Sequence, residues 1–136
     1  MPIPSLACMA LVAAYHHLPP RVLPSIQAVE GGSVGTVQRN RDGSEDLGLM
    51  QINTLWLPTL AALAGTTPEQ VRQRLLADPC FNIAAAGAIL AQYRRAEAGD
   101  LMRAIGDYHS HTAALNQRYQ GDVTRAAGRL FGQPRP

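Results

Sequence analysis

Charge is scarce in this chain of 136 residues, and neither sign dominates. Asp, Glu, Lys and Arg make up 16% of the residues, and the formal net charge is +2 with histidine neutral. Nucleic-acid binders carry a strongly basic stripe, so this balance argues against a nucleic-acid partner. Hydrophobic residues make up 46% of the chain, which favours a globular protein over a disordered one. The length predicts a single domain over residues 1–136, with a core at about 5–130 and a frayed tail at 131–136.

A long apolar run is also missing. The mostly apolar stretch from Ile3 to Ala14 is far too short to span a bilayer, so we expect no stable membrane insertion. A secretory leader carries basic residues before its apolar segment, whereas the first basic side chain here is Arg21. We interpret the stretch as the first core helix and expect that this chain contains no signal peptide.

Patterns typical of metal sites are weak. His16 and His17 diverge on a helix, and the His-x-His pair at 109 and 111 has no evident carboxylate partner, so we expect no metal. The two cysteines, Cys8 and Cys80, lie far apart in the chain. Their spacing is compatible with one disulfide and equally with two buried thiols.

Helical patterns dominate the sequence. Helices are expected at about residues 4–17, 20–30, 54–64, 67–77, 80–98, 100–109 and 112–130. Strand signals occur only near 34–37 and 46–52, and the turn residues 41–44 between them predict a small β-hairpin. Long strands do not alternate with the helices, which excludes a parallel sheet and predicts an α+β, mainly α, fold. Pro24 fits its helix only in the first turn, where backbone N–H groups have no helical partner.

Glu30 closes a helix segment that is otherwise uncharged, and Gly31-Gly32 follows at once. Partial desolvation and the negative C-terminal end of the helix both raise the pKa of a carboxyl group. A raised pKa keeps the carboxyl protonated near neutral pH, as a general acid requires. On position alone, an ordinary solvated glutamate at a helix end is the simpler interpretation.

Residues 40–53 combine a carboxylate-rich turn with an apolar segment that carries the amides of Gln51 and Asn53. Amides donate and accept hydrogen bonds at once, so beside a carboxylate they suit a ligand rich in hydroxyl and N-acetyl groups. The alternative is a polar hairpin with two structural amides.

Glu30 followed by Gly48-Leu49-Met50-Gln51-Ile52-Asn53 resembles the lysozyme-like lytic transglycosylases that cleave bacterial peptidoglycan. The segments 29–32, 42–44, 78–83 and 104–110 resemble, in the same order, the small enzymes attached to conjugation, type IV and type III secretion systems. The resemblance covers about residues 5–125. It implies a lysozyme-like fold with the hairpin beside the catalytic helix, peptidoglycan glycan strands as substrate, a secretion or conjugation apparatus as partner, a periplasmic location and no cofactor.

The resemblance also implies a mechanism. Glu30 would protonate the glycosidic oxygen between N-acetylmuramic acid and N-acetylglucosamine, and would then act as base on the muramoyl 6-hydroxyl, giving a 1,6-anhydro product. Hen-type lysozymes, which residues 40–53 also resemble, have an aspartate at the position of Asp46. Asp46 is therefore the second catalytic candidate, in a transglycosylase or in a true hydrolase. Strand alternation places Glu45 on the opposite face, where we expect it to be solvated.

The remaining site candidates bind substrate. Gln51 is expected to contact N-acetyl or hydroxyl groups, with Met50 beside it in the motif, whereas Asn53 is expected to be structural. Tyr108 lies where the family carries a tyrosine near the glutamate, so it would orient Glu30 or contact the sugar. Tyr119 would line the cleft, although a core position explains it equally well.

Three further features qualify the resemblance. His109 and Gly31 replace the asparagine and serine that many relatives carry, so roles that rest on those side chains are in doubt. Trp56 is expected to be a core anchor rather than a sugar platform. Because the periplasm is oxidising, the resemblance favours a Cys8–Cys80 disulfide.

The competing functions are a lysozyme-type hydrolase that uses Glu30 and Asp46, and a non-catalytic peptidoglycan-binding assembly protein.

Overall fold

The computed structural model describes residues 3–132, so residues 133–136 of the expected frayed tail lie outside it. Within this range the chain is mainly helical with one small sheet, which confirms the expected lysozyme-like, mainly α, α+β class. The elements are α1 (Leu6–Tyr15), α2 (Val22–Glu30), β1 (Val37–Arg39), β2 (Glu45–Leu47), β3 (Ile52–Asn53), the 3-10 helix η1 (Thr54–Trp56), α3 (Leu57–Ala64), α4 (Pro68–Ala77), α5 (Pro79–Ala96), α6 (Leu101–His109) and α7 (Ala113–Phe131).

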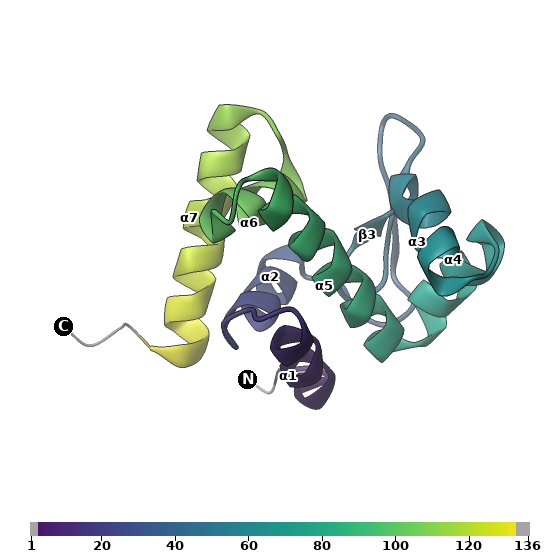
Figure 1. The fold of residues 1–136 in the computed structure, drawn as a ribbon, viewed down its shortest axis with the longest axis horizontal. Coiled ribbons are helices and arrows are strands. Elements are labelled where there is room, and N and C mark those ends of the chain that lie inside the picture. Colours follow the sequence, from purple (N-terminus) through teal and green to yellow (C-terminus); the bar gives the residue numbers. More distant parts are fainter. Residues whose placement is uncertain (1–2, 133–136) are drawn as a thin grey trace.

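Helix α5 divides the molecule into two lobes. Figure 1 shows α5 crossing the middle, with α6 and α7 on one side and the sheet, α3 and α4 on the other. Helices α1 and α2 pack against the α5–α7 side, and α2 lies along α7. Among residues 3–132 no single helix is long and apolar enough to cross a bilayer; only α4 and α5 together, bent by 116° at their junction, meet that test by length and composition.

Helix α2 places Glu30 at its last position. Pro24 lies in the first turn, because the helix begins at Val22, and the missing N–H of the proline therefore costs no helical hydrogen bond. Gly31 ends the helix with φ +70°, a left-handed conformation that glycine adopts without steric cost. The predicted positions of Pro24 and of the glycine stop are both confirmed.

The sheet differs from the predicted hairpin. Strands β1 and β2 pair antiparallel as expected, but β2 also pairs with β3, which makes three strands. The apolar segment 46–52 is not one strand, because a turn at residues 48–51 separates β2 from β3. Gly48 and Gln51 both have positive φ values, +70° and +55°, which no continuous strand can contain.

Asn82 of α5 explains why this turn forms. Its fully buried side-chain amide donates to the carbonyls of Leu47 and Leu75 and accepts from the backbone N–H of Met50, at 2.8–3.0 Å. A Cβ on Gly48 would lie 2.4 Å from the Asn82 Nδ2, so only glycine fits there. The amide therefore satisfies two backbone groups at the buried turn and one in α4, and it fixes the turn on α5.

Cys8 and Cys80 form a disulfide, with 5.5 Å between their Cα atoms. The bond joins α1 to the beginning of α5, two helices that also pack together where Val12 lies over Gly87. The pairing favoured by the family resemblance is thus present in the structure.

Candidate active site

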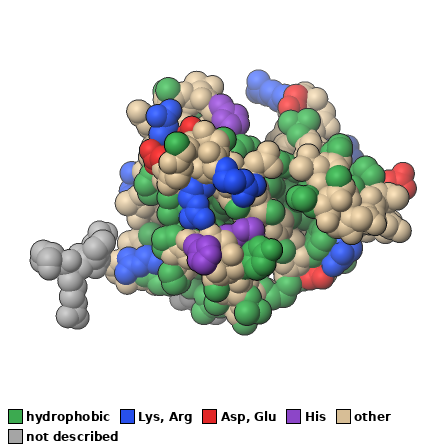
Figure 2. Space-filling view, viewed as in Figure 1, with side chains coloured by type: hydrophobic (Ala, Val, Ile, Leu, Met, Phe, Trp, Pro, Cys, Tyr) green, Lys and Arg blue, Asp and Glu red, His purple; other side chains and the backbone are tan. Residues whose placement is uncertain are grey.

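A cleft of about 410 Å³ lies between the two lobes, and Glu30 and Asp46 both line it. Figure 2 shows the molecule notched at the top, between the α6–α7 end and the tip of the β1–β2 hairpin. The hairpin lobe contributes Gln51 and Trp56, and the helical lobe contributes Tyr93 and Tyr108. The cleft therefore mixes carboxyl, amide and aromatic groups, the combination expected for a carbohydrate ligand.

The Glu30 carboxyl is half-buried, and its environment raises its pKa from the ordinary value of 4.5 to about 7. Burial is the largest cause, because it disfavours the charged form. The negative charge of Asp46 raises the pKa further, whereas a hydrogen bond from Tyr119 lowers it. Near neutral pH the group can therefore both give and accept a proton.

Tyr119 of α7 is the side chain that holds Glu30. Its hydroxyl donates to Glu30 Oε2 at 2.5 Å, and the residue is buried. Tyr108 instead donates its hydroxyl proton to the carbonyl of Met50 at 2.7 Å, so it lines the cleft without orienting Glu30. The orienting role expected of Tyr108 thus falls to Tyr119, because α7 runs along α2 and brings Tyr119 to the carboxyl.

Asp46 and Glu45 face opposite sides of β2, as strand alternation predicts. Asp46 faces the cleft and accepts a hydrogen bond from Asn53 Nδ2 at 3.0 Å. Glu45 is paired with Arg72 at 2.9 Å and with Arg39 at 3.7 Å, and its side chain is only 20% exposed. The expectation that Glu45 is solvated was wrong, because α4 places Arg72 over it.

The motif residues 50–53 divide between site and scaffold. Gln51 lines the cleft, and its side-chain Nε2 donates to the carbonyl of Gly48 at 2.9 Å, which fixes the amide in place. Met50 is fully buried in the core and does not line the cleft, so the substrate-binding role expected of its side chain was wrong. Asn53 caps η1 by accepting from the Leu55 N–H at 2.9 Å, as expected of a structural residue.

Three residues in the helical wall of the cleft were not predicted from the sequence. Tyr93, Asp107 and His111 all line the cleft. His111 Nδ1 lies 3.2 Å from Asp107 Oδ1, so the expectation that this histidine lacks a carboxylate partner was wrong. Helical spacing does not reveal the pair, because α6 ends at His109 and His111 lies in the loop before α7. No group of three or more His, Cys, Asp or Glu side chains in residues 3–132 is arranged to hold a metal ion.

Two aromatic contacts complete the site. The ring of Trp56 meets that of Tyr93 edge to face at 5.6 Å, and Trp56 both lines the cleft and packs on the core. His109 stacks parallel on Tyr119, with 5.0 Å between ring centroids. The residue that departs from the family pattern therefore covers the tyrosine that holds Glu30.

Replacing Tyr119 with phenylalanine tests the hydrogen bond to Glu30. The bond lowers the pKa of Glu30, so its loss should raise that pKa further and move the alkaline limb of the pH–kcat/KM profile upward. A shift of about one pH unit is expected for a charge-assisted hydrogen bond. Tyr15→Phe on the exposed face of α1 is the matched control. An unmoved or downward-shifted limb would contradict the assignment.

The family model for the transglycosylase SLT domain matches residues 9–129. Invasion protein IagB of Salmonella typhimurium is 37% identical over 102 residues, which cover 72% of this chain and 60% of that protein. Invasion protein IagB of Salmonella typhi is 37% identical over 79 residues, covering 58% of this chain and 46% of that protein. The chain thus spans less than two thirds of the length of these relatives. Because the family match covers nearly the whole chain, the chain belongs to the transglycosylase SLT domain family.

Proposed function

We propose that this protein is a peptidoglycan lytic transglycosylase that cleaves the β-1,4 bond between N-acetylmuramic acid and N-acetylglucosamine. The observation that carries the proposal is the Glu30 carboxyl, half-buried in the cleft, with a pKa of about 7 and a hydrogen bond from Tyr119. Membership of the SLT domain family supports the same substrate.

The reaction uses Glu30 twice. Protonated Glu30 gives its proton to the glycosidic oxygen as the bond from that oxygen to the muramoyl C1 breaks, which leaves positive charge at C1. The resulting carboxylate then takes the proton of the muramoyl 6-hydroxyl, and the hydroxyl oxygen bonds to C1 to form the 1,6-anhydro ring. Glu30 is protonated again at the end, and no water is consumed.

The surrounding side chains suit these two steps. Tyr119 donates to the Glu30 carboxylate and so stabilises the charged form that the first step produces. Asp46 adds negative charge to the cleft beside Glu30, where it would stabilise positive charge developing at C1. The fixed amide of Gln51 would hold an N-acetyl or hydroxyl group of the glycan.

Asp46 also favours a second candidate, a lysozyme-type hydrolase in which two carboxyl groups act on one bond. Mass spectrometry of the soluble products from purified peptidoglycan, with Glu30→Gln as the blank, separates the two. The proposal expects muropeptides ending in 1,6-anhydro-muramic acid, each lighter by one water than the hydrolysed form. Reducing-end products would instead establish the hydrolase.

Substitution of Asp46 by asparagine tests the same choice independently. In a transglycosylase the substrate's own hydroxyl is the nucleophile, so Asp46→Asn is expected to retain a measurable rate, about 10- to 100-fold below wild type. A hydrolase that requires Asp46 would lose its activity to the level of Glu30→Gln. The release of soluble muropeptides from sacculi provides the rate, and Glu69→Gln, which removes an exposed carboxyl at the beginning of α4, is the control.

The biological setting that we propose is the periplasm, where the enzyme would open the wall locally for a secretion or conjugation apparatus. The resemblance of the motifs to secretion-associated enzymes supports this setting, and the relatives carry the name Invasion protein IagB. Clearing of sacculus-containing gels would exclude the non-catalytic binding protein, which would be retained by sacculi without dissolving them.

A further inference from the structure

A second hollow opens beside the catalytic cleft, on the helical lobe. This side pocket has a volume of about 420 Å³ and is lined by the polar side chains Glu97, Arg103, Asp107, His111, Gln117 and Gln120. Asp107 and His111 line the catalytic cleft as well, so the two hollows meet at this pair. The side pocket is therefore within reach of a group that branches from a ligand in the cleft at this pair.

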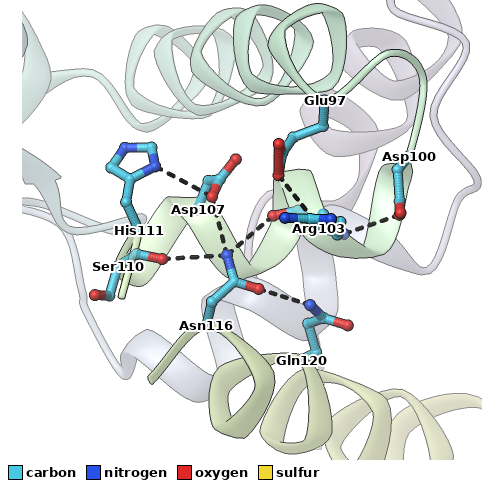
Figure 3. Close-up of polar contacts among 8 residues, drawn as sticks. All are labelled: Glu97, Asp100, Arg103, Asp107, Ser110, His111, Asn116 and Gln120. Carbon is cyan, nitrogen blue, oxygen red and sulfur yellow. Dashed lines mark hydrogen bonds and ion pairs between the residues drawn. The ribbon is translucent and has the colours of Figure 1, made fainter. Parts of the chain in front are cut away.

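The lining of the side pocket is held in place by Asn116 of α7. Figure 3 shows its amide at the centre of the cluster, bonded to Asp107, to the carbonyls of Arg103 and Ser110, and to Gln120. Asn116 is buried, and a Cβ on Gly106 would collide with its side chain. Helices α6 and α7 are therefore closely packed at this point. The pocket is thus a preformed feature of the α6–α7 junction.

Groups of both charge signs remain free to bind a ligand. Arg103 contacts Glu97 through Nε at 3.3 Å, and within residues 3–132 its two Nη groups make no hydrogen bond. The carboxylate of Asp107 uses Oδ1 for both Asn116 and His111, which leaves Oδ2 available. The pocket therefore offers a guanidinium fork for a carboxylate and acidic oxygens for an amine.

These properties favour a peptide over a sugar or a polyanion. The side pocket has no Phe, Tyr or Trp in its described lining, in contrast to the catalytic cleft with Trp56 and Tyr93, so it offers no face on which a pyranose ring could stack. Two carboxylates beside one arginine would repel a polyanion. A short peptide that carries carboxylates, amides and a free amino group matches both charges and the glutamine amides.

We propose that the side pocket binds the peptide stem that branches from a muramoyl unit of the glycan held in the cleft. This inference rests on the proposed function, because only a muramoyl strand in the catalytic cleft brings such a stem to the junction at Asp107 and His111. The stem contributes binding energy away from the bond that is cleaved, so the enzyme distinguishes peptide-bearing strands from bare ones.

The test compares two substrates, glycan strands with their stems and the same strands stripped by an amidase. Wild type should have the higher kcat/KM on the stemmed strands. Arg103→Gln and Gln117→Ala, both at exposed positions on different helices, should lower the ratio of kcat/KM on stemmed strands to kcat/KM on stripped strands. About tenfold is expected for Arg103→Gln, the loss of one charge-assisted hydrogen bond. Arg129→Gln near the far end of α7 should keep the wild-type ratio.

The outcomes separate the inference from the proposed function. Wild type that cleaves both substrates equally well, or an unchanged ratio in Arg103→Gln and Gln117→Ala, overturns the side-pocket inference and leaves the proposed function standing. Wild type that releases product from neither substrate overturns both. Thermal melts of the two variants, expected within a few degrees of wild type because both side chains are exposed, exclude misfolding as the cause of a lower ratio.

Discussion

Glu30→Gln is expected to lower the release of muropeptides by about 10³- to 10⁴-fold, the upper range for the loss of a general acid–base group. The effect is large because one carboxyl performs both proton transfers, and a carboxamide can perform neither. The assay measures the soluble product released from purified sacculi when the purified variant is the only enzyme added. Glu69→Gln, which removes an exposed carboxyl at the beginning of α4, should leave the rate unchanged.

Thermal melting of the Glu30→Gln variant tests whether its fold is intact. A carboxyl whose folded-state pKa is raised stabilises the fold fully below its unfolded value of about 4.5, and this stability is lost as pH rises through the folded value of about 7. The carboxamide that replaces it in Glu30→Gln does not ionise, so the variant should melt at a higher temperature than wild type at pH 8 and lose this advantage near pH 5. An inactive variant that melts far below wild type, or one that keeps a tenth of the activity, would contradict the role of Glu30.

Removal of the Cys8–Cys80 disulfide should have the largest effect on stability. The bond closes a loop with a sequence separation of 72 residues, and a loop of this length stabilises a fold by about 4 kcal/mol in the chain-entropy model. For a domain of this size the double variant Cys8→Ala/Cys80→Ala should melt roughly 10–15 °C below wild type. Differential scanning calorimetry measures the shift.

Reduction provides the matched control for the disulfide. A thiol reductant should lower the melting temperature of wild type toward that of the double alanine variant, and should leave the variant itself unchanged. Equal melting temperatures of wild type with and without reductant would show that the bond contributes nothing to stability. Thiol titration of the unreduced protein should find no free thiol.

The helices were largely predictable from sequence because their signals are local. Asp78 and Asp100 cap α5 and α6, Thr67 and Pro68 open α4, and Gly31 ends α2, each as its residue type indicates. The sheet was less predictable, since the turn at residues 48–51 depends on Asn82, which lies far along the chain. A period-two pattern cannot show that an amide on another helix will break a strand.

The candidate site also contains features that the sequence predicts and features that it does not. Glu30 could be singled out because it is the only charge in its helix and is followed at once by a helix stop. Its partner was expected to be Tyr108 and is Tyr119, because the contact depends on how α7 packs against α2. Met50 and Glu45 were misjudged for the same reason, since one side chain enters the core and α4 covers the other. Motif spacing identifies the neighbourhood of a residue, whereas packing decides which way its side chain faces.

The three hydrogen bonds of Asn82 also have a mechanical consequence. Because two of them fix the turn that carries Gln51 to α5, and Tyr108 of α6 holds the same turn through the carbonyl of Met50, this wall of the cleft is tied to both α5 and α6. Backbone amide exchange should therefore be slow at Met50 and faster at the hairpin tip around Gly43, which these hydrogen bonds do not reach.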